Sequence, residues 1–304
     1  MGIISRGTDR ISFMVGSPWI LINYRERRPI TPVSEDNGRL MFPDDAVTAI
    51  KSLLVMEPAD PDRLRVAAIL IDPGHGGKDP GTIGGYRTDG NAAAGKTVKI
   101  TEKDVNLAVS IDLFAALTAA YPDKKILLTR NSDTYPTLEE RVEMANSIHL
   151  GRNEAIIFIS IHTNASLNSK AKGIEVWYLP PEYRRTVVST ETHPDEPEEV
   201  LPILNSMLEE EFTVESIILA KKILDSVIKE AGQKTENRGL KEESWFVVRN
   251  ARMPSVLIEL GFVTNNDEAA LLGSADYLIQ LSRGIYNGIK EFINYFETTV
   301  GFTQ

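Results

Sequence analysis

The sequence predicts an α/β fold: a mostly parallel or mixed twisted sheet flanked by helices on both faces, with a small β-rich segment at the N-terminus. Two continuous apolar runs, Val66–Ile71 and Ala155–Ile161, are typical of strands that are buried on both faces. Helical patterns alternate with such runs from Val66 onward, which favours a layered α/β architecture. The 304 residues are 42% hydrophobic and 25% charged, so the chain can form a full-sized core.

Composition divides the chain into two parts and a linker. Residues 1–55 are expected to form a small β-rich segment, with strands at Ile11–Val15 and Trp19–Tyr24. Residues 56–64 contain prolines and acidic residues, which indicates a linker. The main domain is expected over residues 65–297, followed by a tail at 298–304.

Helices and strands of the main domain follow from periodicity and capping signals. A helix is predicted over residues 102–120, with Thr101 as N-cap and with an apolar face formed by Leu107, Ile111, Phe114 and Leu117. Thr137 and Glu140 form a capping box, which begins a second helix. The other predicted elements are strands at 126–129, 174–179, 246–248 and 255–260, and helices at 214–231 and 276–296.

Charge and composition exclude several classes of protein. The chain has 33 basic and 43 acidic residues, a net charge of −10, so we expect no nucleic-acid partner. It has no cysteine, which excludes disulfides and thiolate metal sites. No apolar run approaches the ~18 residues of a membrane span. The first ten residues lack the apolar stretch of a signal peptide, so an exported protein would be represented here without its leader.

The segment Gly90–Thr97 matches the phosphate-binding loop pattern letter for letter. That loop requires a buried strand directly before it and a helix directly after it. The residues before it are rich in glycine and threonine, and Val98–Ile100 follows instead of a helix start. We therefore expect no nucleotide binding.

Two of the four histidines follow predicted buried strands. His75 lies just after the run that begins at Val66, and His162 lies at the end of the run that begins at Ala155. Ligands of open α/β sheets gather outside the carboxyl ends of the strands. A lone histidine is more often a hydrogen-bonded structural residue, but two at equivalent positions favour a shared metal.

Two acidic residues are candidates for the remaining chemistry. Glu259 lies inside an otherwise apolar strand, where burying a charge costs several kcal/mol unless it is paired or near a metal. A zinc hydrolase needs a third protein ligand and a carboxylate that takes a proton from water. Glu102 begins a predicted helix, where an acid is ordinary because it favours the helix dipole.

Five motifs in order carry a resemblance to a known family. They are Asp72–Gly81, Glu102–Leu107, Thr129–Asp133 with Leu138 and Arg141, Ser160–Ala165, and Ser255–Asn265. Together they resemble the zinc-dependent N-acetylmuramoyl-L-alanine amidases of bacteria, over about residues 66–297. Residues 11–50 resemble the small N-terminal β module of copper amine oxidases.

The amidase resemblance implies a site and a reaction. His75, Glu102 and His162 would bind one Zn²⁺ per chain, and Glu259 would be the catalytic acid and base. The reaction would be hydrolysis of the amide bond between N-acetylmuramic acid and L-alanine in peptidoglycan, for cell-wall remodelling, daughter-cell separation or autolysis. The implied location is the cell envelope, periplasmic or extracellular.

Two loops depart from the family pattern. The loop at residues 82–100 is longer than expected and must lie beside the metal. The insertion at 180–213 falls where some family members carry a segment that blocks the active site, and a short helix is predicted in it at 198–212. If this helix lies over the zinc cleft, an inhibitory fourth zinc ligand would be supplied by Glu209, Glu210 or Glu211. An activator protein would then displace the insertion and release the metal.

Two alternatives remain at this point. The chain could be a peptidoglycan-binding module that has lost catalysis, although all four chemical positions are filled. It could also be a zinc carboxypeptidase or another amidohydrolase on the same scaffold. The new chain ends formed in digested peptidoglycan distinguish the three.

Overall fold

The computed structural model describes residues 2–6, 9–22, 26–36, 38–54, 64–88, 96–151, 153–183, 185–191, 194 and 197–299. The chain splits into two compact units, Met1–Arg63 and Leu64–Gln304. Three predicted features lie mostly outside the described residues: the linker at 56–64, the phosphate-loop pattern at 90–97 and the tail at 298–304.

The N-terminal unit is a small β structure with one helix. Its elements are β1 (Gly2–Arg6), β2 (Asp9–Phe13), β3 (Trp19–Ile22), β4 (Glu26–Pro29), β5 (Ser34–Asp36), β6 (Arg39–Met41) and α1 (Asp44–Leu54). Strands β1 to β4 form an antiparallel sheet in chain order, and β5 pairs with β6. The sequence predicted only strands here, but Ala46 of α1 packs against Ile11 and Ile20, so helix formation covers the sheet's apolar face.

The second unit contains a six-stranded mixed sheet in the order β10-β7-β11-β14-β12-β13. All neighbouring pairs are parallel except β12 with β14. The strands of this sheet are β7 (Arg65–Pro73), β10 (Lys125–Leu128), β11 (Glu154–Asn164), β12 (Ile174–Tyr178), β13 (Asn237–Glu242) and β14 (Ser255–Phe262). The helices are α2 (Glu102–Ala120), α3 (Leu138–Asn146), α4 (Leu201–Ala231), α5 (Phe246–Asn250), α6 (Asn266–Leu272) and α7 (Ala275–Thr299), with a 3-10 turn at Gly232–Lys234.

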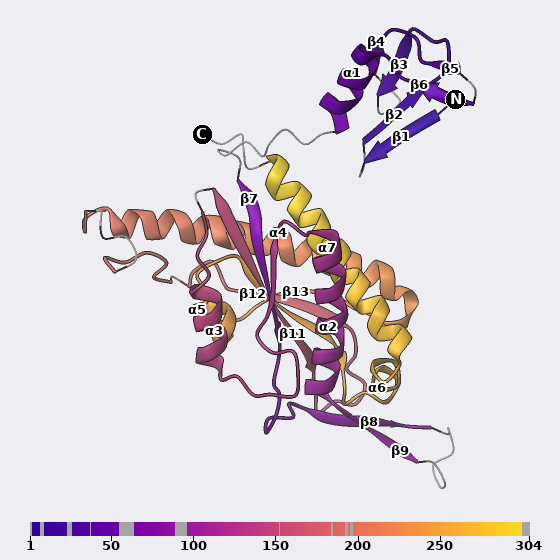
Figure 1. Cartoon of the computed structure of the whole chain (residues 1–304). Helices are drawn as coiled ribbons and strands as arrows, with labels where there is room; N and C mark the ends of the chain where they lie inside the picture. Colours follow the sequence, from indigo (N-terminus) through magenta and orange to yellow (C-terminus); the bar gives the residue numbers. More distant parts are fainter. Residues whose placement is uncertain are drawn as a thin grey trace. The chain divides into compact units, whose positions relative to one another are not determined.

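Helices cover both faces of this sheet, which confirms the predicted fold class (Figure 1). On one face, Ile69 and Ile159 join the core formed with α2, α4 and α7. On the other face, Leu70 and Phe158 pack with residues of α3 and α5. Successive residues of β7 and β11 therefore point to opposite faces, and both are buried, as the continuous apolar runs predicted.

One predicted strand is wrong. Residues 246–248 form the start of α5, because the amide of Arg249 donates to the carbonyl oxygen of Trp245 in a helical bond. Val247 and Val248 are both buried beside β7 and β11. Packing of these two residues against the sheet outweighs the β preference of an aromatic–valine–valine sequence.

The apolar face predicted for α2 is confirmed only in part, because Leu117 is buried in the core and Phe114 packs against it. Ile111 is 41% exposed, whereas the buried side carries Val105, Val109 and Leu113 together with the polar residue Asn106. Asn106 donates to the carbonyl oxygen of Gly74, so a functional loop rather than an apolar surface covers this part of the helix.

The two unusual loops contain regular structure. In the 82–100 loop, β8 (Ile83–Arg87) and β9 (Thr97–Thr101) pair as an antiparallel hairpin that leads directly into α2. In the insertion, the expected short helix is the first part of the 31-residue helix α4, which ends at Gly232 as predicted. Leu201 and its neighbours Leu204 and Leu208 pack against Val187 and Val188 of the preceding segment.

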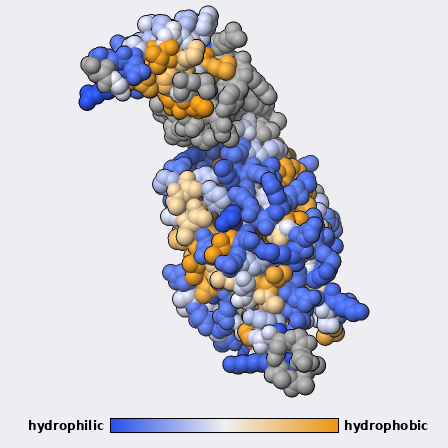
Figure 2. Space-filling model, turned by 90° about the vertical axis from the view of Figure 1, so that its right-hand side faces the viewer, coloured by the Kyte–Doolittle hydropathy of each residue, from blue (hydrophilic) through white to orange (hydrophobic). Residues whose placement is uncertain are grey.

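The surface is mainly polar on the face that Figure 2 shows, where apolar residues occupy small separate areas. Among the described helices, none combines the length and apolar character that a membrane span requires.

Candidate metal centre

The carboxyl end of β7 passes into a tight glycine-rich loop that carries His75. His75 adopts the left-handed conformation, with φ of 60°, which few non-glycine residues occupy. A side chain at Gly74 would come within 2.3 Å of the His162 imidazole. Glycine at position 74 therefore lets the two histidines approach, and the strained backbone at His75 is typical of functional sites.

Glu102 lies between the two histidines. Its Oε1 is 3.1 Å from Nε2 of His75 and 3.0 Å from Nδ1 of His162. The backbone of Thr82, at the base of the hairpin, donates to Oε2 of Glu102 at 2.8 Å. One ligand atom from each of the three side chains lies within 4.8 Å of the others, a spacing at which they could hold one metal ion. Two imidazoles and a carboxylate are a donor set that suits zinc.

The three groups influence one another's protonation. Burial opposes the charge of Glu102, but hydrogen bonds and charge from His162 and His75 outweigh it, so the pKa of Glu102 lies well below its usual value. Burial lowers the pKa of His75, but Glu102 and Asp79 outweigh that effect and raise it. Glu102 is therefore a carboxylate, the form that binds a metal.

Asp79 fixes the orientation of His75. Its Oδ2 lies 2.8 Å from Nδ1 of His75, and its Oδ1 accepts from the amide of Gly81. When Nδ1 of His75 carries the ring proton, Nε2 is unprotonated, and its lone pair points toward Glu102 and His162. A carboxylate behind a histidine ligand commonly plays this part in metal sites.

A buried ion pair between Arg141 and Asp72 supports the loop that carries His75. Nη1 of Arg141 donates to Asp72 at 2.6 Å, and Nη2 of Arg141 donates to the carbonyl oxygen of His75 at 2.7 Å. Arg130 donates to the carbonyl oxygen of Gly74 at 2.9 Å. Burial opposes the charge of Asp72, but Arg141 outweighs it and lowers the pKa of that carboxyl. The loop conformation is therefore set by two arginines from outside the loop.

Glu259 faces the same site from the neighbouring strand. On β14 it is in register with His162 of β11 and with Glu175 of β12. Its Oε2 is buried and has no hydrogen-bond partner among the described residues. Burial, followed by the negative charges of Glu102 and Glu175, raises the pKa of Glu259 well above its usual value. An unpaired buried carboxyl beside a metal-binding group fits a proton-transfer role.

Glu175 is itself paired, unlike Glu259. It accepts from Nδ2 of Asn164 at 2.5 Å and from Nε of Arg238 at 2.7 Å. Glu175 is only 3% exposed, so its negative charge lies in the protein interior beside Glu259, the candidate proton acceptor.

A cavity of about 250 Å³ lies next to the histidines. Its wall is partly aromatic and comes from the segment before α3, from α3 and from α5. The lining residues include His75, His162, Tyr135, Leu138, Arg141, Trp245, Phe246 and Val247. A substrate can therefore approach the centre across an apolar surface.

The structure does not bring the three insertion glutamates to this centre. Glu209 is buried and bonds through Oε1 to Nε of Arg185 at 2.7 Å, and its Oε2 accepts from the Arg185 amide. Glu210 and Glu211 are exposed. Among the described residues, the metal-binding group consists of His75, Glu102 and His162.

Sequence reasoning missed the supporting residues around the centre. Asp79 is in the first motif and four residues after His75, a spacing that a turn can close, so a signal was present. Glu175 gave a weaker signal, an acid in an apolar strand similar to the one that singled out Glu259.

A layered α/β fold that places two histidines and two carboxylates at the carboxyl edge of its sheet is typical of zinc hydrolases. A model of the N-acetylmuramoyl-L-alanine amidase family matches residues 69–291. The chain belongs to this family. It is therefore an enzyme, a hydrolase that cleaves the amide bond between N-acetylmuramic acid and L-alanine in peptidoglycan, as the motifs implied.

Individual relatives agree with the family match. The N-acetylmuramoyl-L-alanine amidase AmiA of Salmonella typhimurium is 28% identical over 250 residues, 78% of this chain and 79% of AmiA. The catalytic domain of the amidase CwlV of Bacillus (Paenibacillus) polymyxa gives a TM-score of 0.54 at 26% identity, over 75% of this chain and 99% of that one. The amidase CwlD of Clostridioides difficile, solved in complex with the GerS lipoprotein, gives 0.54 at 25% identity, over 75% and 98%.

Proposed function

We propose that this amidase is zinc-dependent, with His75, Glu102 and His162 as the ligands of one Zn²⁺ and Glu259 as the catalytic acid and base. The observation that carries the proposal is the close contact of Glu102 with both histidines, near a buried oxygen of Glu259 that has no hydrogen-bond partner among the residues that the structure describes. When bound, Zn²⁺ would polarise the scissile carbonyl and make the attacking water more acidic.

The chain's own residues do the rest of the chemistry in this proposal. Glu259 accepts the proton of the attacking water at its unpaired oxygen and gives it to the leaving amine of L-alanine. The raised pKa of Glu259 suits a group that must hold a proton and then release it. Asp79 keeps His75 in the tautomer that can bind metal.

The test of this function is a digest of purified peptidoglycan with the zinc-loaded protein. The expected result is the release of free L-alanine amino termini. Other new ends would indicate a peptidase, and none would indicate a module that only binds. The ligand set is tested separately: His162→Ala is expected to lose zinc in elemental analysis, and undiminished zinc would contradict the assignment.

The expected location and partner are parts of the same proposal. An enzyme of the cell wall acts in the envelope or outside the cell, and we infer a periplasmic or extracellular site. A protein partner is supported by the complex of CwlD with GerS. Such a partner would bind the exposed Ile203 and Met207 near the start of α4 rather than pull a glutamate from the metal.

A further inference from the structure

Three large apolar side chains are exposed around the cleft beside the metal centre. Trp245 is 42% exposed, Leu138 is 47% exposed and Tyr135 is 37% exposed. All three line the cavity that also contains His75 and His162. Exposed apolar side chains that gather in one place normally mark a binding surface. Because the same cavity contains two of the candidate zinc ligands, the ligand that covers this surface is the substrate.

Trp245 packs against a second tryptophan. The rings of Trp245 and Trp177 meet edge to face, with their centres 5.9 Å apart and their planes at 85°. Trp177 lies on β12 and pairs with Leu257 of β14, which also lines the cleft. Leu257 and Glu259 are two residues apart, so both side chains point to the same face of the sheet, about 6–7 Å apart along the strand. Trp245 therefore lies over the face that carries the candidate proton acceptor.

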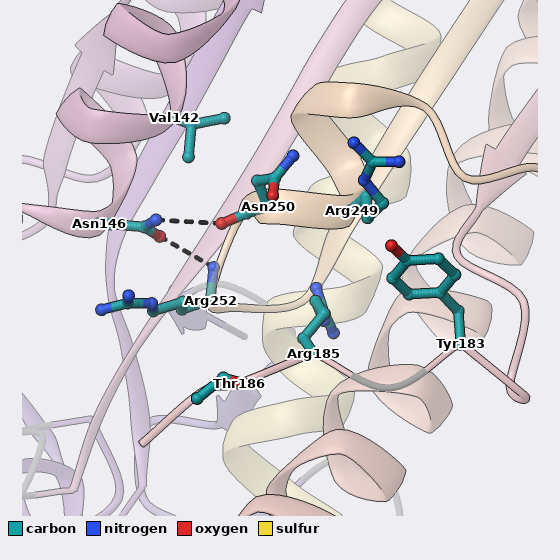
Figure 3. Close-up of a pocket in the computed structure, with 8 residues that line it drawn as sticks. All are labelled: Val142, Asn146, Tyr183, Arg185, Thr186, Arg249, Asn250 and Arg252. Carbon is teal, nitrogen blue, oxygen red and sulfur yellow. Dashed lines mark hydrogen bonds between the residues drawn. The ribbon is translucent and has the colours of Figure 1, made fainter. Parts of the chain in front are cut away.

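The position of Trp245 is set by the anchoring of α5. Trp245 is the N-cap residue of this helix, and its carbonyl oxygen accepts from the amide of Arg249 at 2.8 Å. At the other end of α5, Nδ2 of Asn146 donates to the carbonyl oxygen of Asn250 at 3.0 Å, and Oδ1 of Asn146 accepts from the amide of Arg252 at 2.9 Å (Figure 3). These bonds hold α3 against α5. The backbone at Trp245 is therefore set before any ligand arrives, which lowers the entropic cost of binding.

The charged side chains that line the cleft are paired with one another. Arg141 is 2% exposed and donates to Asp72. The carboxylate of Asp79 is bonded to His75. Among the described residues that line the cleft, Arg141 alone carries a permanent positive charge. An ionised carboxylate would therefore find no free cation in this wall, whereas an uncharged ligand needs none.

The two sides of the cleft differ in charge. On the side of the segment before α3, Nζ of Lys78 lies 4.8 Å from the centre of the Tyr135 ring. On the α5 side, no cation of the described part of the chain lies over the ring of Trp245. The substrate has two matching halves, because the sugar is uncharged once its carboxyl group forms the scissile amide, whereas the stem peptide carries ionised carboxylates. The sugar therefore fits the Trp245 side, and the peptide fits the Lys78 side.

We propose that Trp245 is the platform on which the N-acetylmuramic acid ring packs while its amide carbonyl lies at the metal centre. A pyranose ring presents a face of C–H groups, which packs on the electron-rich face of an indole. Three single bonds of about 1.5 Å each separate the sugar ring from the scissile carbonyl carbon, so one substrate reaches both the metal centre and Trp245. The identity of the sugar rests on the proposed function, whereas binding of an N-acetylated sugar at Trp245 does not.

The experiment observes the indole itself and needs no turnover. The chain has three tryptophans, so the indole N–H groups of the zinc-loaded protein give three NMR resonances. Trp19→Phe and Trp177→Phe assign them, and the Trp245 resonance follows by elimination. The probes are N,N′-diacetylchitobiose, which has the N-acetylated pyranose ring, and the dipeptide L-alanyl-γ-D-glutamate; neither contains the scissile amide. We expect the disaccharide to shift the resonance of Trp245 and to leave that of Trp19 in place.

Variants then test which half of the substrate Trp245 binds. Trp245→Ala should weaken binding of the disaccharide about tenfold, or ~1.4 kcal/mol, because an aromatic face is lost. The dipeptide should bind this variant and the unaltered protein equally. Trp245→Phe should keep part of the disaccharide affinity, since a smaller aromatic face remains. Trp19→Ala removes an exposed tryptophan of the N-terminal unit and is the matched control, for which no change is expected.

A disaccharide titration that leaves the Trp245 resonance of the unaltered protein in place would overturn the proposal, whether or not the variants fold. Unchanged disaccharide affinity in the folded Trp245→Ala variant would also overturn it. Weaker binding of the dipeptide but not of the disaccharide by this variant would assign the platform to the peptide instead. Failure of the peptidoglycan digest would refute the proposed function without changing the results of these titrations.

Discussion

At the scale of single residues, the centre depends on side chains that are not themselves part of the metal-binding group. His75 is strained, and the carbonyl oxygens of Pro73 and Gly74 accept hydrogen bonds from Arg130, while Pro73 also accepts from Arg141. The imidazole is then oriented by Asp79. The structure therefore supports His75 by two kinds of contact, one to its backbone from Arg141 and one to its ring from Asp79.

Asp79→Asn should weaken zinc binding by about 10- to 100-fold, because the amide is a poor partner for the imidazole proton. Competition with a chelator, followed by metal analysis, measures this affinity. Asp225→Asn, which alters an exposed carboxylate of α4 that bonds Lys221, is the matched control. Equal zinc affinity in Asp79→Asn and the unaltered protein would contradict the orienting role.

Glu259→Gln should reduce turnover by roughly 10²–10⁴-fold or more while zinc content and thermal stability stay near those of the unaltered protein. The amide has almost the same shape but cannot accept a proton. Rates on peptidoglycan and metal content together check this. A variant that kept more than about a tenth of the activity would show that another group takes the proton.

At the scale of elements, the insertion is an anchored part of the fold. The Arg185–Glu209 pair is almost completely buried, and the apolar side of the first turns of α4 packs on Val187 and Val188. An acidic segment that the sequence analysis interpreted as a block on the active site is instead fastened to the domain by this ion pair and by apolar packing.

Glu209→Ala should destabilise the protein by about 3–5 kcal/mol, since Arg185 would stay buried without its partner. We expect no rise in the rate on peptidoglycan at a temperature where the variant is folded. Denaturant unfolding and initial rates measure the two effects. Exposed Glu210→Ala is the control, and a tenfold faster Glu209→Ala enzyme would restore the inhibitory interpretation.

The elements that sequence predicted well are those whose apolar pattern is continuous. Strands β7, β11 and β14 are buried on both faces, so nearly all their residues are apolar. The sequence of each strand therefore predicts its burial without any knowledge of the neighbouring elements. The strand predicted at α5 was wrong, and the face predicted for α2 was right only in part, because tertiary contacts decide both: two valines pack against the sheet, and Asn106 bonds to Gly74. Short α6 and polar β13 carry too few apolar residues to show a period.

The candidate site was predictable to a different degree for each residue. His75 and His162 follow buried strands, and Glu259 interrupts one, so local patterns single them out. Glu102 looks like an ordinary first-turn acid, and only the family resemblance assigned it as a ligand. Its contact with both histidines depends on the hairpin that precedes α2, and no local pattern predicts how that hairpin folds.

At the scale of the whole molecule, one buried acid should make stability depend on pH. Glu215 of α4 is 6% exposed, and burial, with a smaller effect of Glu211, raises its pKa to about 8. Its pKa in the unfolded chain is near 4.5. The folded state therefore binds the proton more tightly, and stability is lost as the pH rises from about 4.5 through 8.

Glu215→Gln should accordingly stabilise the protein at pH 8 by a difference on the order of a few kcal/mol, and much less at pH 5. Denaturant unfolding at the two pH values measures this change. Glu211→Gln, an exposed position one turn earlier, should have a small effect. Equal stabilisation by Glu215→Gln at both pH values would show that this group does not titrate in that range.

The order of the strands in the sheet also has a consequence for the order of events when the enzyme folds. His162 and Glu259 lie on β11 and β14, and His75 directly follows β7; these three strands are neighbours in space but far apart in the chain. Parallel pairing over such separations forms slowly, because loop closure must precede the contacts that compensate for it. The complete centre therefore cannot exist in a partly folded chain. During refolding, uptake of zinc should coincide with the last kinetic phase, after the helical signal has recovered.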